Sequence, residues 1–481
     1  MRRNRASRPS LRGLAVLAVA SVALGACVDL APRYSRPAMP VPAALPAGAA
    51  GPAAPDSPQS LAAWRDFFGD PGLKAVIELA LANNRDLRAA TANVAAARAQ
   101  YVVQRANLFP KLNATAGATY GQIPASVVDP GFSGASGIYN ERLYELNAGV
   151  SAWQLDLFGK VRNSTRAALE SYFATRAARE AAQITLIGEV ASDWLTLGAD
   201  RASLAIARDT LVSGDATLSL TKARFAAGVA SDLDVAQADT IVQQARSDVA
   251  RLTTQVDQDR DALELVVGSP VADGLLAADI DHDGVVLADL PEGLASSALF
   301  ARPDVLQAED QLKAANANIG AARAAFFPDI SLTGSGGVTS LALSTLFRSA
   351  AETWTFAPTI TQPIFDFGAN RGNLAYAKAQ RDVDLATYEK AIQTAFREVA
   401  DALARRRTID AQLAAQQGLS DASARAYRLS DARYQRGSDT FLNALIAQRT
   451  LYAARQSLVA TKLERATNLV TLYTSLGGGL K

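Results

Sequence analysis

The sequence has 481 residues but only one cysteine, one histidine and two methionines. A single cysteine cannot form an internal disulfide. So few thiol and imidazole groups also leave almost none of the usual catalytic nucleophiles, general bases and metal ligands. No stretch reaches the roughly 20 consecutive apolar residues that a membrane-spanning helix needs. These absences predict a protein that is not an enzyme, with no cofactor, no metal and no transmembrane helix.

The chain also lacks an excess of charge, with 48 Lys and Arg against 47 Asp and Glu. Five of the arginines lie in residues 1–12, which contain no acid, and an uncharged run rich in Leu, Val and Ala follows at residues 13–26. This order is typical of a secretory signal peptide, which we place at residues 1–26. Its removal lowers Lys and Arg to 43 and gives a net charge of −4, so nothing indicates nucleic-acid binding.

The signal run ends in Leu24-Gly25-Ala26 followed by Cys27, which resembles the lipobox of bacterial lipoproteins. Cleavage before Cys27 would leave an acylated cysteine as the new N-terminus, and more than one acyl chain gives durable membrane anchoring. Val28 follows, whereas an Asp at this position would resemble an inner-membrane retention signal. The outer membrane is therefore the expected location of the lipid anchor.

Residues 27–60 are rich in proline and alanine. Proline opposes helix formation and donates no backbone hydrogen bond, so this stretch is predicted to be an extended tether from the lipid to the body of the protein. Its prolines are Pro32, Pro37, Pro40, Pro42, Pro46, Pro52, Pro55 and Pro58.

The body contains an internal repeat, which constrains architecture more than any single motif. Phe109-Pro110 is echoed by Phe327-Pro328 at an offset of 218, and Phe158-Gly159 by Phe367-Gly368 at an offset of 209. The nine-residue difference between the offsets predicts a loop of variable length between these landmarks in each copy.

Each copy has the same order of elements: a helix, a pair of alternating segments and a long helical hairpin. We expect repeat 1 at residues 61–270, with a β-hairpin at about 111–153 and helices at about 160–267. An inter-repeat, equatorial segment follows at 271–300. Repeat 2 is expected at 301–476, with a β-hairpin at about 329–361 and helices at about 371–476, before a tail at 477–481.

The paired segments alternate apolar and polar residues with a period of two, which is typical of half-buried strands. Glycines and serines near residues 131–137 and 335–340 predict exposed loops at the tips of the two hairpins. Four strands cannot close a membrane barrel, and hydrocarbon does not tolerate open edges. A membrane role therefore requires an oligomer, and three copies would supply about twelve strands. A small soluble hairpin remains the alternative.

The helical stretches are rich in strong helix formers and nearly free of proline. A seven-residue spacing, typical of a coiled coil, links Leu197, Leu204, Leu211, Leu218 and Phe225. Each stretch is interrupted once, at Gly228 and at Gly437, so each is predicted to be a hairpin of two helices. An ordinary soluble coiled coil remains the alternative.

The ordered set of motifs resembles the TolC-like outer-membrane efflux family, in its NodT and OprM lipoprotein branch. The shared motifs are C-x-x-x-x-P-x-Y-x-R-P at residues 27–37, residues 64–73, Phe109-Pro110, Asp156-Leu157-Phe158-Gly159, Pro363-Ile364-Phe365-Asp366-Phe367-Gly368, Arg433-Tyr434-x-x-Gly437 and Leu476-Gly477-Gly478-Gly479.

The resemblance implies a mainly α fold with a transmembrane β-barrel. Three copies would form a barrel of twelve strands in the outer membrane and a periplasmic barrel of twelve helices. The implied partners are outer-membrane lipid, a periplasmic adaptor and an inner-membrane pump of the resistance-nodulation-division type. The channel itself would be a passive exit duct, with the hairpin tips at Gly228 and Gly437 meeting the adaptor or pump.

The resemblance also locates a periplasmic gate at Leu442, Asn443, Ile446 and Arg449. Relatives place aspartates here, whereas this sequence has Asn443 and Ile446 at those positions. Rings of Leu442 and Ile446 would close the duct by excluding water. The alternative is that these two side chains only pack the hairpin.

Two further alternatives remain open. Residues 279–284 imitate the D-x-D-x-D-G start of a calcium loop, but position twelve is Leu290 instead of Glu, so we expect a solvated turn. For function, the same fold serves as an exit duct in type I protein secretion, and a periplasmic lipoprotein without a pore is a third candidate.

Overall fold

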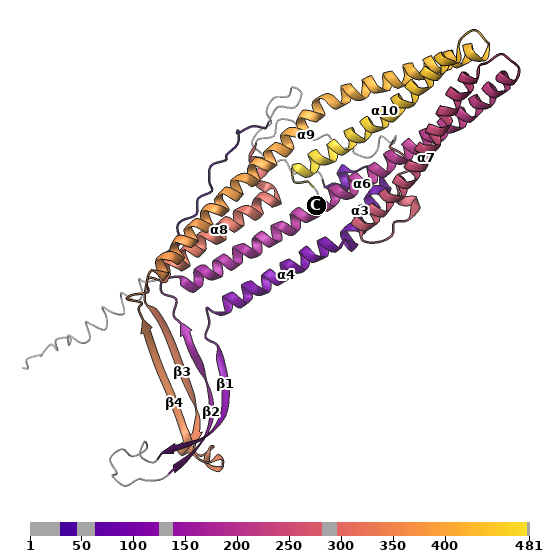
Figure 1. Cartoon of the computed structure of the whole chain (residues 1–481). Coiled ribbons are helices and arrows are strands. Elements are labelled where there is room, and N and C mark those ends of the chain that lie inside the picture. The colour runs from indigo at the N-terminus through magenta and orange to yellow at the C-terminus, as the bar shows by residue number, and fades with distance from the viewer. Residues whose placement is uncertain (1–28, 46–62, 125–137, 281–295, 479–481) are drawn as a thin grey trace, which may run out of the picture. The chain divides into compact units, whose positions relative to one another are not determined.

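The protein is described by a computed structural model over residues 29–45, 63–124, 138–280 and 296–478 (Figure 1). It consists of two compact units. One comprises residues 1–36, 95–174 and 309–386, and the other comprises residues 37–94, 175–308 and 387–481. Within the described ranges, no helix combines the length and the hydropathy that crossing a bilayer requires.

The helices reproduce the internal repeat residue for residue. Helices α4 (Arg85–Ala106) and α8 (Pro303–Ala324) have 22 residues each, and both bounds differ by 218. Helices α6 (Lys160–Ala226) and α9 (Ala369–Gln435) have 67 residues each, and both bounds differ by 209. Each long helix is followed by a shorter one, α7 (Asp232–Val267) or α10 (Phe441–Ser475).

The four strands form one antiparallel sheet in the order β1-β2-β3-β4. The strands are β1 (Leu112–Pro124), β2 (Ile138–Gln154), β3 (Asp329–Ser340) and β4 (Glu352–Thr361). β2 of the first repeat pairs with β3 of the second, so the two expected hairpins are joined into one sheet. The pairing is interrupted between Val150 and Trp153 by a β-bulge.

The sheet has one apolar and one polar face, because directly paired residues project to the same side. On one face Ala148 lies between Ala114 and Gly336, and β4 adds the exposed side chains of Trp354 and Phe356. The other face is formed by the residues one position further along each strand. Its polar side chains are Asn113, Thr115, Thr119, Glu141, Glu145, Asn147, Ser335, Thr339, Thr353, Thr355 and Thr359.

The prediction of a loop at residues 335–340 is wrong. Ser335, Gly336, Gly337 and Ser340 all belong to β3 and pair with β2. The turn to β4 lies beyond them, where the short 3-10 helices Leu343–Thr345 and Ser349–Ala351 occur. Glycine is needed inside this strand because a Cβ at Gly337 would collide with the carbonyl oxygen of Leu146 and the side chain of Asn147. The first tip, at residues 131–137, lies outside the described residues.

The long helices pack through the heptad positions that the sequence indicates. Leu197, Leu204 and Leu218 are buried, and Leu211 packs against a buried cluster that includes Val242 of α7. Phe225, the last member of the series, is exposed.

The core of the second unit is anchored by aromatic rings. Helix α2 (Trp64–Phe67) places Phe67 flat against Tyr473 of α10, with ring centroids 3.9 Å apart. Phe68 meets the same ring edge-on at 6.2 Å. Helix α3 (Pro71–Asn83) begins directly after this segment. Asp70 caps its N-terminus, because the Asp70 side chain accepts a hydrogen bond from the Leu73 amide at 2.9 Å.

The sheet packing gives a first prediction. Gly337→Ala should destabilise the protein by about 1–3 kcal/mol, because the added methyl group collides with the β2 backbone. Gly336→Ala is the matched control in the same strand, since its added Cβ would come no closer than 4.0 Å to the carbonyl oxygen of Thr353. Thermal unfolding followed by circular dichroism measures both. Equal stability of the two variants would contradict the assigned register.

Candidate channel end and anchoring segment

The two helical hairpins turn through the same backbone geometry. Gly228 and Gly437 both have φ of +74°, a left-handed conformation that favours glycine. The Gly228 amide donates to the Phe225 carbonyl at 2.9 Å, and the Gly437 amide donates to the Tyr434 carbonyl at 3.0 Å. A β-carbon at either glycine would meet no neighbouring atom, so glycine is required there by backbone angle and not by space.

One arginine ties the two hairpin ends together. Arg224 of α6 donates to the carbonyls of Tyr434 at 3.0 Å and Gln435 at 2.8 Å. Its guanidinium carbon also lies 4.4 Å from the centroid of the Tyr434 ring, within reach of a cation–π interaction. These contacts satisfy carbonyls at the end of α9 that have no partner inside the helix.

Beneath this contact the hairpins share an apolar core. Its buried members are Leu218, Ala238, Ile241, Val242, Tyr434, Phe441, Ala444 and Leu445. α10 therefore directs Phe441, Ala444 and Leu445 toward its neighbours. The spacing of three and then one residue is that of a single buried helix face.

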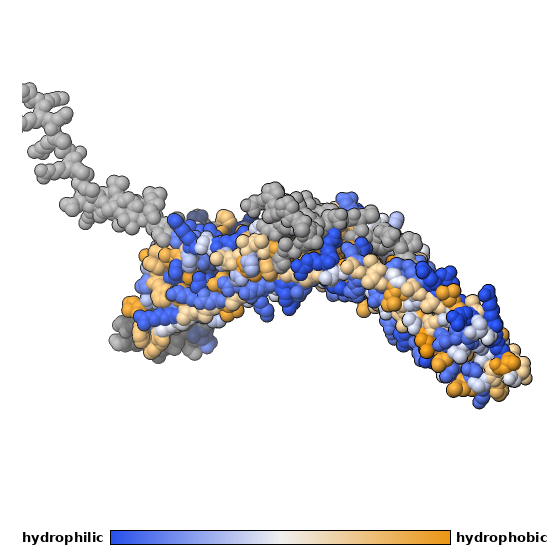
Figure 2. All heavy atoms as spheres, turned by 90° about the horizontal axis from the view of Figure 1, so that it is seen from above, coloured by the Kyte–Doolittle hydropathy of each residue, from blue (hydrophilic) through white to orange (hydrophobic). Residues whose placement is uncertain are grey.

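The expected gate residues lie on a different face of α10. Leu442 is 49% exposed and Ile446 is 54% exposed, and Asn443 and Arg449 are exposed as well. Leu442, Ile446 and Arg449 follow at i, i+4 and i+7, so they share one stripe of the helix. Figure 2 shows hydrophobic residues at the surface of the hairpin ends, at the right of the view. Within one chain, Leu442 and Ile446 do not pack the hairpin.

Polar contacts fix the start of α10. The Asn443 amide donates to Asp439 at 2.7 Å, and Arg433 lies 3.2 Å from the other oxygen of that carboxylate. The hydrogen bonds from Asn443 and from the Thr440 amide, with the charge of Arg433, lower the pKa of Asp439. The turn therefore keeps one negative charge at neutral pH.

Two further contacts join α10 to α7. Arg449 donates to the Thr240 hydroxyl at 2.9 Å, and the Tyr452 hydroxyl donates to Asp248 at 3.0 Å. Burial and the hydrogen bond to Asp248 raise the pKa of Tyr452 to about 12. The Tyr452 hydroxyl therefore stays protonated, and remains a donor, under physiological conditions.

The first described residues of the proline-rich stretch, 29–36, contain no helix or strand and are bound to helices of the first unit. Asp29 accepts hydrogen bonds from Asn163 at 3.0 Å and from Arg166 at 3.1 Å, in the first turns of α6. The carbonyls of Leu30 and Pro32 accept from Arg323 and Asn316 of α8. We call residues 29–36 the strap. Cys27 lies outside the described residues, two positions before its first contact.

The strap is locked by one buried carboxylate, Glu309 of α8, whose side chain is 2% exposed. Arg36 donates to both of its oxygens, at 3.0 and 2.8 Å, and the Tyr34 hydroxyl donates at 3.0 Å. Burial raises the pKa of Glu309, but the hydrogen bonds from Arg36 and Tyr34 and the charge of Lys313 outweigh it and lower this pKa below 4.5. Lys313 also lies over the Tyr34 ring.

Sequence reasoning located the two hairpin turns but missed the residues that hold them together. Tyr434 appears in the sequence only within the motif Arg433-Tyr434-x-x-Gly437. The one signal for Arg224 is its position four residues before Gly228, which matches that of Arg433 before Gly437. Tyr34 and Arg36 were visible in the opening motif, but their partner Glu309 is 273 residues or more away. Most of the D-x-D-x-D-G stretch, residues 281–284, lies outside the described residues.

Two 67-residue helices, each leading from a pair of strands to a glycine turn, define a class of protein: an outer-membrane channel subunit with a helical tunnel. The sequence profile described as "Outer membrane efflux protein" matches residues 76–269 and 294–478. The chain belongs to the outer membrane efflux protein family, as its motifs predict. Proteins of this family and its relatives are channels and not known enzymes.

Curated relatives match over nearly the whole chain. The toluene efflux pump outer membrane protein TtgC of Pseudomonas putida is 44% identical over 471 residues, covering 97% of this chain and 96% of that protein. Outer membrane protein OprJ of Pseudomonas aeruginosa is 40% identical over 469 residues, with the same coverage.

Solved structures share the fold. A membrane protein from Pseudomonas aeruginosa superimposes with a TM-score of 0.86 at 40% identity, covering 94% of this chain and 98% of that one. The open-state MtrE outer membrane channel of Neisseria gonorrhoeae gives 0.83 at 35% identity, covering 94% and 99%. The expected fold class and the outer-membrane location are confirmed.

The strap contacts give a second prediction. Trypsin cleaves after arginine, and Arg33 is an exposed site within the strap. The next residue, Tyr34, is bound to Glu309, so cleavage after Arg33 requires the strap to leave α8. Glu309→Gln should speed this cleavage by roughly tenfold or more, because hydrogen bonds to an ionised group are lost. Glu78→Gln is the control, since Glu78 pairs with Arg65 at 3.2 Å on the exposed surface. Equal cleavage rates in both variants would contradict the lock.

The pH dependence has a defined sign. A carboxylate whose pKa is lowered by folding stabilises the protein above its unfolded pKa, about 4.5 for Glu309, and loses that contribution as pH falls through the folded value. The wild type should therefore have a higher Tm than Glu309→Gln, and this difference should be largest at neutral pH. It should shrink as pH drops below about 4.5.

Proposed function

We propose that this chain is the outer-membrane subunit of a tripartite efflux system, working as a passive exit duct for small molecules. The observation that supports this most is the sheet. Among the described residues, β1 and β4 each pair with one strand only, and β4 exposes Trp354, Phe356 and Ile360 on its apolar face. An isolated sheet of this kind would expose both its edges and its apolar face.

Three copies remove this conflict. If β1 of each chain pairs with β4 of the next, twelve strands close and every backbone group finds a partner. The apolar face then meets lipid, and the face with Asn113, Thr115 and Thr355 lines a water-filled interior. The exit duct therefore depends on homotrimer formation.

The proposed partners and cargo follow from the relatives. TtgC carries the name of a toluene efflux pump protein, and a protein of equal similarity, ArpC of Pseudomonas putida, that of an antibiotic efflux pump protein. We infer small, largely apolar molecules as cargo, driven by an inner-membrane pump through a periplasmic adaptor. The hairpin turns at Gly228 and Gly437 are the proposed contact with these partners.

The strap supports acylation at Cys27. Asp29 is bound in the first turns of α6, and α6 starts six residues after β2 ends. Acyl chains two residues away would thus reach the membrane at the level where the sheet begins. A type I secretion duct, the second candidate, has no need of this lipid anchor.

The gate is proposed at the exposed stripe of α10. In a trimer, three Leu442 and three Ile446 side chains facing the axis would exclude water, while Asn443 and Arg449 flank them. The contacts of Arg449 with Thr240 and of Tyr452 with Asp248 would hold this closed position.

Pore formation is the direct test of the function. The purified full chain should run as a heat-modifiable trimer and give single-channel conductance in planar bilayers. Expression in a strain that lacks its own duct should restore resistance to toluene or to antibiotics. A monomer without conductance would instead indicate a structural lipoprotein, and conductance without restored resistance would favour protein secretion.

The gate gives a separate prediction. Ile446→Ala should raise the open probability and the conductance, because a smaller side chain widens the apolar constriction. Val212→Ala, at an exposed valine of α6 outside the stripe, should behave as wild type. Unchanged conductance of Ile446→Ala would refute gating at this position.

A further inference from the structure

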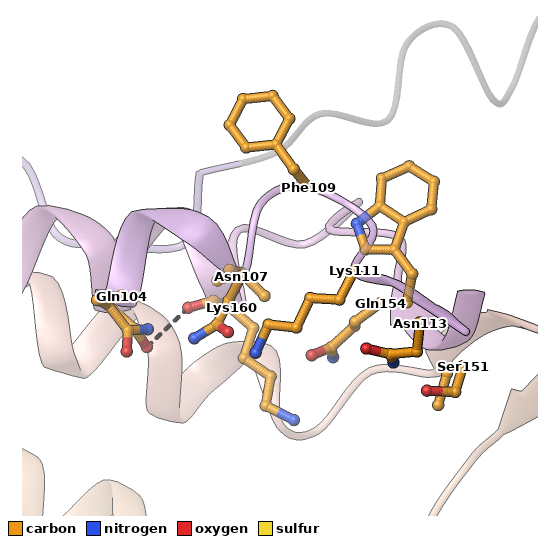
Figure 3. Close-up of a pocket in the computed structure, with 12 residues that line it drawn as sticks. Gln104, Asn107, Phe109, Lys111, Asn113, Ser151, Gln154 and Lys160 are labelled. Atoms are coloured by element: carbon orange, nitrogen blue, oxygen red, sulfur yellow. Dashed lines mark hydrogen bonds between the residues drawn. The ribbon is translucent and has the colours of Figure 1, made fainter. Parts of the chain in front are cut away.

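A polar pocket lies in the first unit, where α4 leads into β1 and β2 leads into α6 (Figure 3). Its volume is about 360 Å³, within the range of sites for small organic ligands. Nothing in the duct function requires a ligand here.

Two lysines give the pocket its charge. Lys111 directly precedes β1, and Lys160 is the first residue of α6. No carboxylate belongs to the described residues that line it. Lys160 Nζ lies 3.3 Å from Oδ2 of Asp329, which does not line the pocket. Both side chains are more than 40% exposed, so this ion pair is weak. Lys111 makes no ion pair within the part of the chain that the structure describes.

Neutral donors surround the two ammonium groups. The side-chain amides of Asn107, Asn113 and Gln154 line the pocket, together with the Ser151 hydroxyl. In Figure 3 the side chains of Lys111 and Lys160 extend between Asn107 and Gln154, whereas the Phe109 ring points away from them. The N-terminus of α6 adds a partial positive charge beside Lys160.

The backbone is distorted at this pocket. Ala152, which lines it, has φ of +49°, an uncommon value for a residue with a β-carbon. It lies inside the β-bulge between Val150 and Trp153. The bulge interrupts the pairing of β2 with β3, which resumes at Trp153, and both Ser151 and Gln154 line the pocket. Strain of this kind is concentrated at binding sites, where it positions side chains.

We propose that this pocket binds the phosphate group of an anionic molecule. Two ammonium groups match one or two negative charges, and amide and hydroxyl donors match the remaining phosphate oxygens. An apolar solute would leave these donors without partners.

The phosphate has two possible sources. Asn113 lies on the polar face of the sheet, where water would bring a free phosphate. The pocket also lies at the end of the sheet, which in the proposed channel is the level of phospholipid headgroups. Only this second placement rests on the proposed function.

The test uses the full chain in a neutral detergent with two probes. Inorganic phosphate is titrated and followed by the ³¹P resonance, and retention of phosphatidylglycerol or phosphatidylcholine is measured by native mass spectrometry. We expect saturable phosphate binding, or selective retention of phosphatidylglycerol. The first result identifies a free phosphate and the second a lipid headgroup.

The double variant Lys111→Gln with Lys160→Gln should weaken the observed binding at least about tenfold, since two charge-assisted contacts are lost. Lys111→Arg keeps the charge and should bind as wild type, and Lys378→Gln is the control at an exposed lysine of α9. Absence of binding by both probes, or equal binding by the double variant, would overturn the proposal. Conductance, measured separately, tests the duct.

Discussion

A sheet of four strands leaves the backbone groups along its two outer edges without partners. In water those groups bind solvent, but in hydrocarbon each one costs several kcal/mol. The exposed Trp354, Phe356 and Ile360 place β4 in hydrocarbon, so its outer edge has to be paired. Pairing between copies is the solution consistent with the antiparallel order of the strands, and it would enclose the polar face of the sheet.

Because of the internal duplication, the chain uses one arrangement of strands and helices twice. Both long helices have 67 residues, and each is followed two residues later by a glycine with the same φ of +74°. The copies are not interchangeable, however. Arg224 of the first copy binds the end of α9, and its counterpart Arg433 pairs with Asp439 in its own turn. An asymmetric pair of tips thus arises from a symmetric repeat. Leu442 has an exposed counterpart in Leu233 of α7, but Ile446 corresponds to Gln237, so the pair of apolar side chains occurs only in the second copy.

Two of the polar sites of the first unit lie at the junction between strands and helices. The strap ends there through Asp29, and Lys111 and Lys160 line the pocket there. The β-bulge between Val150 and Trp153 lies near the end of the pairing of β2 with β3, before this junction, and one further pair of residues follows it at Gln154 and Ser331. A concentration of hydrogen-bonding groups is expected where a chain passes from a lipid environment into water, because both backbone and side chains change partners at that level.

The sequence by itself determined the elements whose signal is local or repeated. Period-two alternation gave the strands, heptad leucines such as Leu204 gave the buried side of α6, and Gly228 and Gly437 gave the turns, since only glycine adopts their backbone angles freely. Tertiary structure decided what depends on distant partners. Gly337 lies within a strand and not in a loop because the backbone of β2 approaches it. Glu309 became the lock of the strap because folding brings it to Tyr34 and Arg36. Leu442 and Ile446 stay exposed because Phe441, Ala444 and Leu445 fill the apolar core on the other side of α10.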